Sequence, residues 1–439
     1  MDIFLGVIIG LLVLMLLVTA HEFGHFIMAR RNGVNVLEFG ICFPPRAIAW
    51  IKDPKTGKWR RLPRKEWKKE KASKVVYSDG DKDKTLTQKG MIFSLNWLPI
   101  GGFCQMDGES AADTRKGTFG KASYWSKTKI LFGGVAMNWI VAFIIFTILA
   151  WTGMPEFLEG QFTLPVDTRT ESTPVEITSV VEESPAAQAG LKEGDLVISV
   201  DGNEFTRASE ITDYNETHAG EEVSYIIQRE YTEPVIAPQC VNAPCTDTED
   251  ITKTETLEKA VTLNDANSEY LLGVTMATTQ SLSYSTWSAP VVGAGLTVQL
   301  TGETFKGVGI LLWNLVSGVG SQFSPDSNVR QSGQEAISTV GDSVSGPVGI
   351  IGQLFPAFTA AGPTNLAFLT ALISVSLACM NVLPIPALDG GRWLLITIYK
   401  LRKKKLTKET EEKIVSRAFI VLLALIFIVT ILDIVRIAN

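Results

Sequence analysis

A histidine-containing motif near the N-terminus offers the clearest chemistry in the chain. His21-Glu22-Phe23-Gly24-His25 lies inside the apolar stretch 3–29. Because residues i and i+4 share one face of a helix, His21 and His25 can present two imidazole nitrogens to one ion, with Glu22 beside them. Zinc prefers such ligands, and a catalytic zinc site keeps one position open for water. The alternative is a structural histidine pair, but ionisable groups in a membrane span are costly and usually functional.

A catalytic zinc site needs a third protein ligand, which has to come from elsewhere in the chain. Asp389 is the only acid in the apolar stretch 365–400, and it follows Pro384 and Pro386. Prolines open the helical hydrogen-bond ladder, which is tolerated at membrane depth where protein or a water-filled cavity satisfies the backbone. We therefore expect Asp389 to complete the site. The alternative is a buried partner of Arg392 or of an amide in the second span.

Charge is distributed unevenly along the 439 residues, which are 46% hydrophobic and carry a net charge of −6. Basic residues predominate in 30–129 and in the cluster 400–405, whereas acidic residues predominate in 153–330. Basic loops of membrane proteins remain in the cytoplasm, so we expect both basic stretches there and the acidic middle outside. The positive charge belongs to juxtamembrane loops, and nucleic-acid binding is not supported.

The apolar segments predict a polytopic α-helical membrane protein with about four transmembrane helices. The spans are expected at 1–30, 129–152, 366–399 and 418–439, with cytoplasmic segments at 31–128 and 400–417. This topology places both termini outside the cell membrane and the histidine motif near its cytoplasmic side. A further span within 283–365 would move the last basic loop outside, so we expect an outer amphipathic helix and a linker there.

The cytoplasmic segment between the first two spans is expected to contain β-structure. Stretches 47–51 and 59–62 flank a turn signal at 53–57 and predict a hairpin. Stretch 93–106 predicts a strand interrupted by Gly101 and Gly102, and such glycines often mark close approach of another backbone. A looped strand near the zinc could pair with an extended substrate, although a plain turn is the alternative.

Small and polar residues in the second span predict contacts between helices. Gly133 and Gly134 would let a neighbouring helix approach closely, and Asn138 would bond across to a neighbour.

The outer region 153–282 alternates apolar and polar residues between turn signals, most clearly over 174–264, which predicts strands. Within it, 184–190 reads as a capped short helix that ends at Gly190. Cys240 and Cys245 are expected outside the membrane, where they could pair or stay reduced.

In combination these motifs resemble the site-2 protease family of intramembrane zinc metalloproteases, and most of all its branch containing the bacterial regulator of sigma-E protease. The likeness covers the HExxH motif, 98–103, 345–350, the Asn-x-x-Pro-x-Pro-x-x-Asp-Gly stretch 381–391, and 184–202, which resembles a PDZ domain. An HExxH motif combined with that intramembrane aspartate motif is highly specific.

The resemblance assigns roles to individual residues. It implies that His21, His25 and Asp389 bind one zinc ion and that Glu22 is the catalytic acid/base. Substrate-binding roles fall on Asn381 and Pro384, on Asn138 in the second span, and on Gly101 and Gly102 in the family's membrane-associated β-loop. The family's Gly-Pro-x-x-Asn appears here as 134–138, which retains Asn138.

The resemblance also implies a function. The expected substrates are single-span membrane proteins, such as anti-sigma factors or remnant signal peptides, already trimmed outside by another protease. The partners would be the lipid bilayer and a peptide or chain terminus at one extracytoplasmic α+β PDZ-like domain. Two other functions stay open: a non-enzymatic membrane scaffold with a structural zinc site, and a metal transporter, since intramembrane His and Asp also line ion paths.

Overall fold

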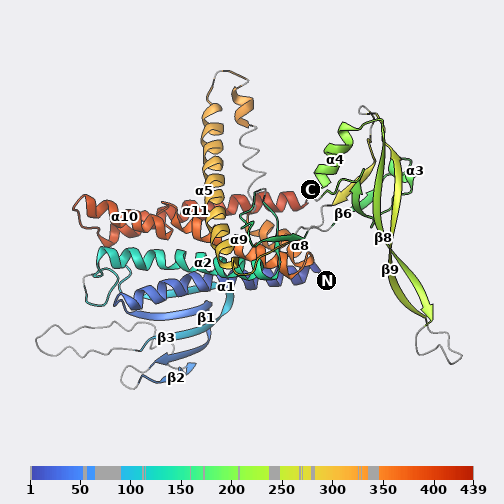
Figure 1. Ribbon diagram of the computed structural model, residues 1–439. Helices are drawn as coiled ribbons and strands as arrows, with labels where there is room; N and C mark the ends of the chain where they lie inside the picture. The colour runs from blue at the N-terminus through green and yellow to red at the C-terminus, as the bar shows by residue number, and fades with distance from the viewer. Residues whose placement is uncertain are drawn as a thin grey trace, which may run out of the picture. The chain divides into compact units, whose positions relative to one another are not determined.

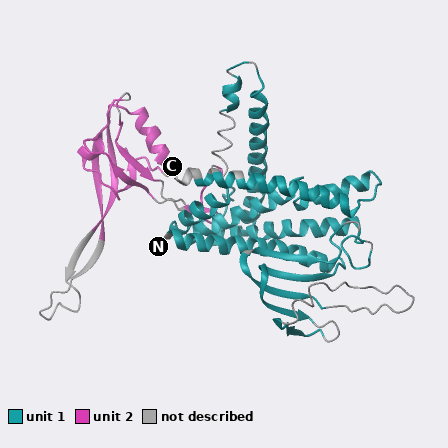
Figure 2. Ribbon diagram, turned by 180° about the vertical axis from the view of Figure 1, so that it is seen from behind, with its two compact units in different colours: residues 1–154, 162–167, 285–439 teal, residues 155–161, 168–284 magenta. Residues whose placement is uncertain are grey.

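The computed structural model describes two compact units, shown in teal and magenta in Figure 2. Unit 1 contains Met1–Met154, Phe162–Asp167 and Ser285–Asn439, and unit 2 contains Pro155–Gln161 and Thr168–Tyr284. The structure describes all residues except 1, 53–56, 65–89, 111, 112, 114, 159, 172, 173, 206, 207, 237–247, 266, 267, 269, 278–281, 325, 328, 335–345 and 439. Cys240, Cys245 and much of the long basic loop therefore lie outside the described residues.

Unit 1 is dominated by apolar helices (Figure 1). They are α1 (Asp2–Arg31), α2 (Tyr124–Thr152), α5 (Ala289–Ser321), α7 (Pro347–Gly349), the π-helical turn η4 (Ile350–Leu354), α8 (Phe355–Ala360), α9 (Pro363–Val382), α10 (Asp389–Leu401) and α11 (Lys408–Ala438). Within the described residues, four stretches are long and apolar enough to cross a membrane: Ile3–Arg31, Tyr124–Thr152, Pro363–Val382 and Lys408–Ile431. Each overlaps one of the four predicted spans.

The predicted third span, 366–399, is corrected by the structure because it is not one helix. α9 ends at Val382, and a separate helix, α10, starts at Asp389 and has only 13 residues. A Cβ atom at Gly390 would lie 2.0 Å from the Val382 carbonyl oxygen, so only glycine lets the link fold this tightly onto α10. The prolines correctly indicated a break, but α10 is too short to cross a bilayer.

The segment between α1 and α2 forms an antiparallel sheet in the order β2-β1-β3. Its strands are β1 (Val36–Lys52), β2 (Trp59–Arg61) and β3 (Ile92–Met106). Pairing of Trp50 with Arg61 confirms the predicted hairpin. Ile41 faces both Leu95 and Gly102, so the first half of β1 lies between the two halves of β3. The stretch 102–106 is consequently an outer strand.

Helices α1 and α2 approach each other at glycines. A Cβ atom at Gly24 would lie 2.1 Å from the Gly133 carbonyl oxygen, and one at Gly133 would lie 2.8 Å from the Gly24 oxygen. The two backbones are therefore in direct contact, which confirms the packing role predicted for the glycine pair in α2.

Helix α5 occupies the stretch for which an amphipathic outer helix was expected. Its first half buries Val292 and Leu296, whereas its second half exposes Trp313 and Val316. Its start is fixed by Asp167, whose carboxylate accepts hydrogen bonds from backbone and hydroxyl groups of Thr286 and Ser288. The Ser288 and Thr286 hydroxyls hold the pKa of Asp167 well below its usual range.

Unit 2 contains a five-stranded sheet in the order β10-β6-β7-β8-β9. Its elements, with β4 at the boundary of the units, are β4 (Met154–Pro155), β5 (Arg169–Glu171), β6 (Val175–Val180), α3 (Pro185–Ala189), β7 (Leu196–Val200), α4 (Ala208–Thr217), β8 (Glu222–Ile236), β9 (Thr248–Thr262), β10 (Val274–Ala277) and β11 (Leu282–Tyr284). The capped helix is confirmed, because the Ser184 hydroxyl accepts from the Ala187 N–H and Gly190 has φ 78°. The range 174–264 was too short, since β10 completes the sheet by pairing with β6.

We predict that Gly24→Ala lowers the stability of the purified protein by about 1–3 kcal/mol, because the added methyl group forces the α1 and α2 backbones apart. Thermal unfolding in detergent measures this change. Gly302→Ala on α5 is the matched control, since a Cβ atom there meets nothing within 4 Å. Equal unfolding temperatures for Gly24→Ala and the control would contradict the close packing.

Candidate metal centre and active site

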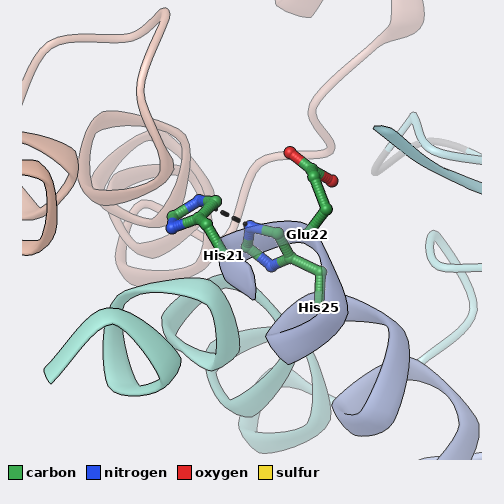
Figure 3. A group of neighbouring side chains, drawn as sticks. All are labelled: His21, Glu22 and His25. Atoms are coloured by element: carbon green, nitrogen blue, oxygen red, sulfur yellow. Dashed lines mark hydrogen bonds between the residues drawn. The ribbon is translucent and has the colours of Figure 1, made fainter. Parts of the chain in front are cut away.

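Two imidazoles from α1 face each other across one helical turn, as the spacing predicted (Figure 3). The Nε2 atoms of His21 and His25 lie 3.1 Å apart, and the residues are only 8% and 7% exposed. Two imidazole nitrogens at this distance, shielded from solvent, can serve as ligands of one ion.

Asp389 joins the histidines from a point 368 residues further along the chain. Its Oδ2 atom lies 3.1 Å from His21 Nε2 and 3.3 Å from His25 Nε2. Asp389 is the first residue of α10, and its position follows from the tight link held against Gly390. Neither alternative partner is bonded to Asp389. The Arg392 guanidinium contacts Glu109 and Glu411, and the Asn138 side-chain amide has no hydrogen-bond partner among the described atoms.

The three atoms form a triangle with edges of 3.1, 3.1 and 3.3 Å. Ligands about 2.0–2.1 Å from a tetrahedral zinc ion are separated by about 3.3 Å, so the two nitrogens and the oxygen fit zinc without rearrangement. His25 Nδ1 lies 2.8 Å from the Ile130 carbonyl oxygen, and donation there leaves the Nε2 lone pair free for a metal. His21 Nδ1 has no hydrogen-bond partner among the described atoms.

Glu22 lies beside the histidine pair (Figure 3). One oxygen of its carboxylate and one nitrogen of each histidine lie within 4.8 Å of one another. The carboxylate also accepts a hydrogen bond from the backbone N–H of Cys104, on the outer strand 102–106. A carboxylate next to a metal site and a strand edge can exchange protons with a group bound between them.

A glycine on α2 gives the imidazoles their space. A Cβ atom at Gly134 would lie 2.6 Å from the Nε2 atoms of both His21 and His25. From the sequence, Gly134 was expected only to pack helices together, and this contact with the histidines was not predicted. The signal in the sequence was the position of Gly134 four residues, or one helical turn, before Asn138, where the family has its Gly-Pro-x-x-Asn motif.

The predicted substrate-binding residues lie in different surroundings. Gly101 and Gly102 reach α1 just before the histidine motif, where a Cβ atom at Gly101 would lie 2.7 Å from Val18 and one at Gly102 would lie 3.1 Å from the Thr19 hydroxyl oxygen. Gly101 also has φ 75°, which favours glycine.

The two asparagines differ in their partners. Asn138 is fully buried, and its side-chain nitrogen and oxygen have no hydrogen-bond partner among the described atoms. The cross-helix bond runs instead from the Ser374 hydroxyl to the Asn138 backbone carbonyl, at 2.8 Å. Asn381 donates to the Leu377 carbonyl within α9, and Pro384 lies exposed in the link before α10. In the described part of the chain, no hydrogen bond joins Asn381 to the three candidate ligands.

Comparisons with known proteins agree with this geometry. Residues 9–60 and 80–426 match the model of peptidase family M50. The regulator of sigma-W protease of Bacillus subtilis is 26% identical over 475 residues, covering 96% of this chain and 96% of its own. A zinc metalloprotease of Bacillus licheniformis is 25% identical over 479 residues, covering 98% and 99% of the two chains.

A solved structure also matches in part. The PDZ domain of an SdrC-like protein from Listeria monocytogenes is 23% identical, covers 24% of this chain and 90% of its own, and has a TM-score of 0.16. That score is too low to assign the fold of unit 2. The family match extends over most of the sequence, including α1, the sheet, α2, α9 and α10. The chain belongs to peptidase family M50.

Proposed function

We propose that this peptidase is a zinc enzyme that hydrolyses a peptide bond of single-span membrane proteins within or just beneath the bilayer. The observation that carries the proposal is the triangle of His21, His25 and Asp389 with Glu22 beside it. Both histidines and Glu22 lie on α1, a helix apolar enough to cross a membrane, and Asp389 joins them from the start of α10. The names of the two Bacillus relatives, a zinc metalloprotease and a regulator of sigma-W protease, support the same metal and reaction.

The chain's own residues divide the work of hydrolysis. His21, His25 and Asp389 hold the zinc ion, which when bound supplies a Lewis acid that polarises the scissile carbonyl and makes water more acidic. Glu22 takes the proton of the attacking water and delivers it to the leaving amine. The buried position of both histidines strengthens these charge interactions by keeping bulk water away.

The substrate has to be extended before it can be cut, because a helix hides its carbonyls in hydrogen bonds. The outer strand 102–106 supports strand addition, since its Cys104 N–H already points to Glu22 rather than to β1. The unpartnered amide of Asn138 and the half-buried Asn381 are further candidates for holding the unwound segment, with Pro384 nearby in sequence.

Unit 2 supports the recognition of a peptide or chain terminus. A cavity of about 340 Å³ lies beside the edge strand β10 and is lined by Val274 and Met276 of that strand and by Thr212 and Asn215 of α4. An edge strand beside such a cavity suits an added peptide strand, as in PDZ domains.

The charge pattern supports a cell-membrane location with both termini and unit 2 outside and with the active site near the cytoplasmic side. Substrates of this arrangement would be anti-sigma factors or remnant signal peptides, and the lipid bilayer is the other partner.

We predict that Glu22→Gln lowers cleavage of a purified single-span reporter by at least about 100-fold. Among the described residues, the Glu22 carboxylate is the group beside the two histidines that is not itself a candidate ligand and can take the proton. Zinc content should stay stoichiometric in this variant. Asp389→Ala and a zinc chelator should both abolish cleavage, and Asp389→Ala should also lose zinc. Full cleavage by Glu22→Gln with zinc bound would refute the mechanism, and cleavage that persists without zinc would refute the zinc enzyme.

We also predict that a helix-breaking Gly-Pro pair in the reporter's apolar segment raises the cleavage rate about 10-fold, because less free energy is spent on unwinding. The matched control is an Ala-Leu pair at the same positions. Equal rates for the two reporters in detergent would argue against strand addition as the mode of binding.

A further inference from the structure

Arg392 lies on α10, three residues after Asp389. Its guanidinium donates to the Glu109 backbone carbonyl, and its Nε atom lies 3.5 Å from Glu411 Oε1. Its central carbon also lies 5.0 Å from the centre of the Phe119 ring. One side chain therefore joins the helix of the third ligand to α11 and to the described residues of the loop 107–120, which are 107–110, 113 and 115–120.

The ion pair between Arg392 and Glu411 is strengthened because the Glu411 carboxylate is shielded from water. Its side chain is 6% exposed, and it accepts a second hydrogen bond of 3.0 Å from the Ser110 hydroxyl. Removing one partner of a buried ion pair is strongly destabilising, since it leaves an uncompensated charge. The first turn of α11 is thus held to both α10 and the loop 107–120.

The loop 107–120 is held from a further side. Phe119 is fully buried, and Lys127 at the start of α2 lies 5.8 Å from the centre of its ring. The same loop directly follows the outer strand 102–106, whose Cys104 N–H reaches Glu22. Its position therefore affects both the strand and the catalytic carboxylate.

Arg392 and its partners also line a cavity that reaches the candidate metal centre. The cavity has a volume of about 830 Å³, and its lining includes Asp389, Arg392, Ser110 and Glu411. The link 383–388 before Asp389 contains two prolines, and the hydrogen bonds that its backbone N–H groups donate run only to residues two or three positions earlier, within the link or to Met380. These short turns do not tie the link to another element, so the contacts of Arg392 add an anchor from outside it.

We propose that Arg392 is a positioning residue for the metal centre, and that its pairing with Glu411 holds the start of α10 so that Asp389 stays at ligand distance from the histidines. This inference rests on the proposed function, because it takes Asp389 as a zinc ligand. Neither Arg392 nor Glu411 contacts the substrate or the metal in this account.

The test measures zinc affinity of the full-length protein in detergent by competition with a chromogenic chelator. Arg392→Gln and Glu411→Gln should each weaken zinc binding about 10-fold, as loss of residues that orient ligands typically does. The double variant should be no weaker than the poorer single variant, because both changes remove the same pair. Arg402→Gln, at the exposed C-terminal end of α10, is the matched control and should leave the affinity within about twofold.

Zinc affinities of both single variants within twofold of the unchanged protein would overturn the proposal, as would independent, multiplying effects in the double variant. A fall in unfolding temperature without a change in zinc affinity would likewise assign a structural role only. If Arg392→Gln does not purify folded, Arg392→Lys takes its place and should weaken binding less. Failure of the unchanged protein to bind zinc or cleave the reporter would instead overturn the proposed function.

Discussion

The rest of the structure depends on one constraint: two histidines of α1 and an aspartate 368 residues later have to meet within 3.3 Å of one another in a largely buried site. Burying an unpaired ionisable group costs free energy. The site is therefore stable only if these groups bind a common metal ion or hydrogen-bond to one another. The neighbouring elements hold the three side chains in this arrangement. Gly134 leaves room for the imidazoles, Ile130 orients His25, and the tight link at Gly390 delivers the aspartate.

In the proposed function, the sheet beside α1 would link the metal centre to a substrate. β1 and β3 pair in two registers, which leaves the stretch 102–106 at the outer edge, next to Glu22. A strand edge is unstable in a bilayer unless something satisfies its backbone groups, and an extended substrate would do so. In that function the strand edge would favour unwinding of a substrate helix and would bring its exposed carbonyl towards the three candidate ligands. The fixed loop 107–120 couples this strand to α10.

Much of the site could be predicted from sequence because its signals are local or unusual. The i, i+4 spacing of His21 and His25 requires only a helix, and a lone acid in an apolar stretch singles out Asp389. The sheet's hairpin and the capped helix α3 also follow from short-range patterns. The length of the third span could not be predicted in this way. Two prolines show where a helix breaks but not whether it resumes in the same direction.

Contacts set by tertiary packing stayed hidden from the sequence. Gly134 looks like any packing glycine until α1 is placed against α2, and Arg392 donates to the carbonyl of Glu109, 283 residues away in the chain. The extent of unit 2 was underestimated for the same reason, since β10 joins the sheet through pairing with a strand about 95 residues earlier. Local patterns specify elements, whereas long-range pairing decides which of them complete a domain.

The most direct test of the central claim is X-ray absorption spectroscopy at the zinc edge of the purified full-length protein. The account predicts one zinc ion per chain with nitrogen and oxygen neighbours at about 2.0–2.2 Å and the multiple-scattering signature of two imidazoles. Substitution of Asp389 by alanine should reduce the zinc content. A sulfur neighbour at about 2.3 Å, which would place a cysteine such as Cys104 at the metal, or a protein without stoichiometric zinc would contradict the account.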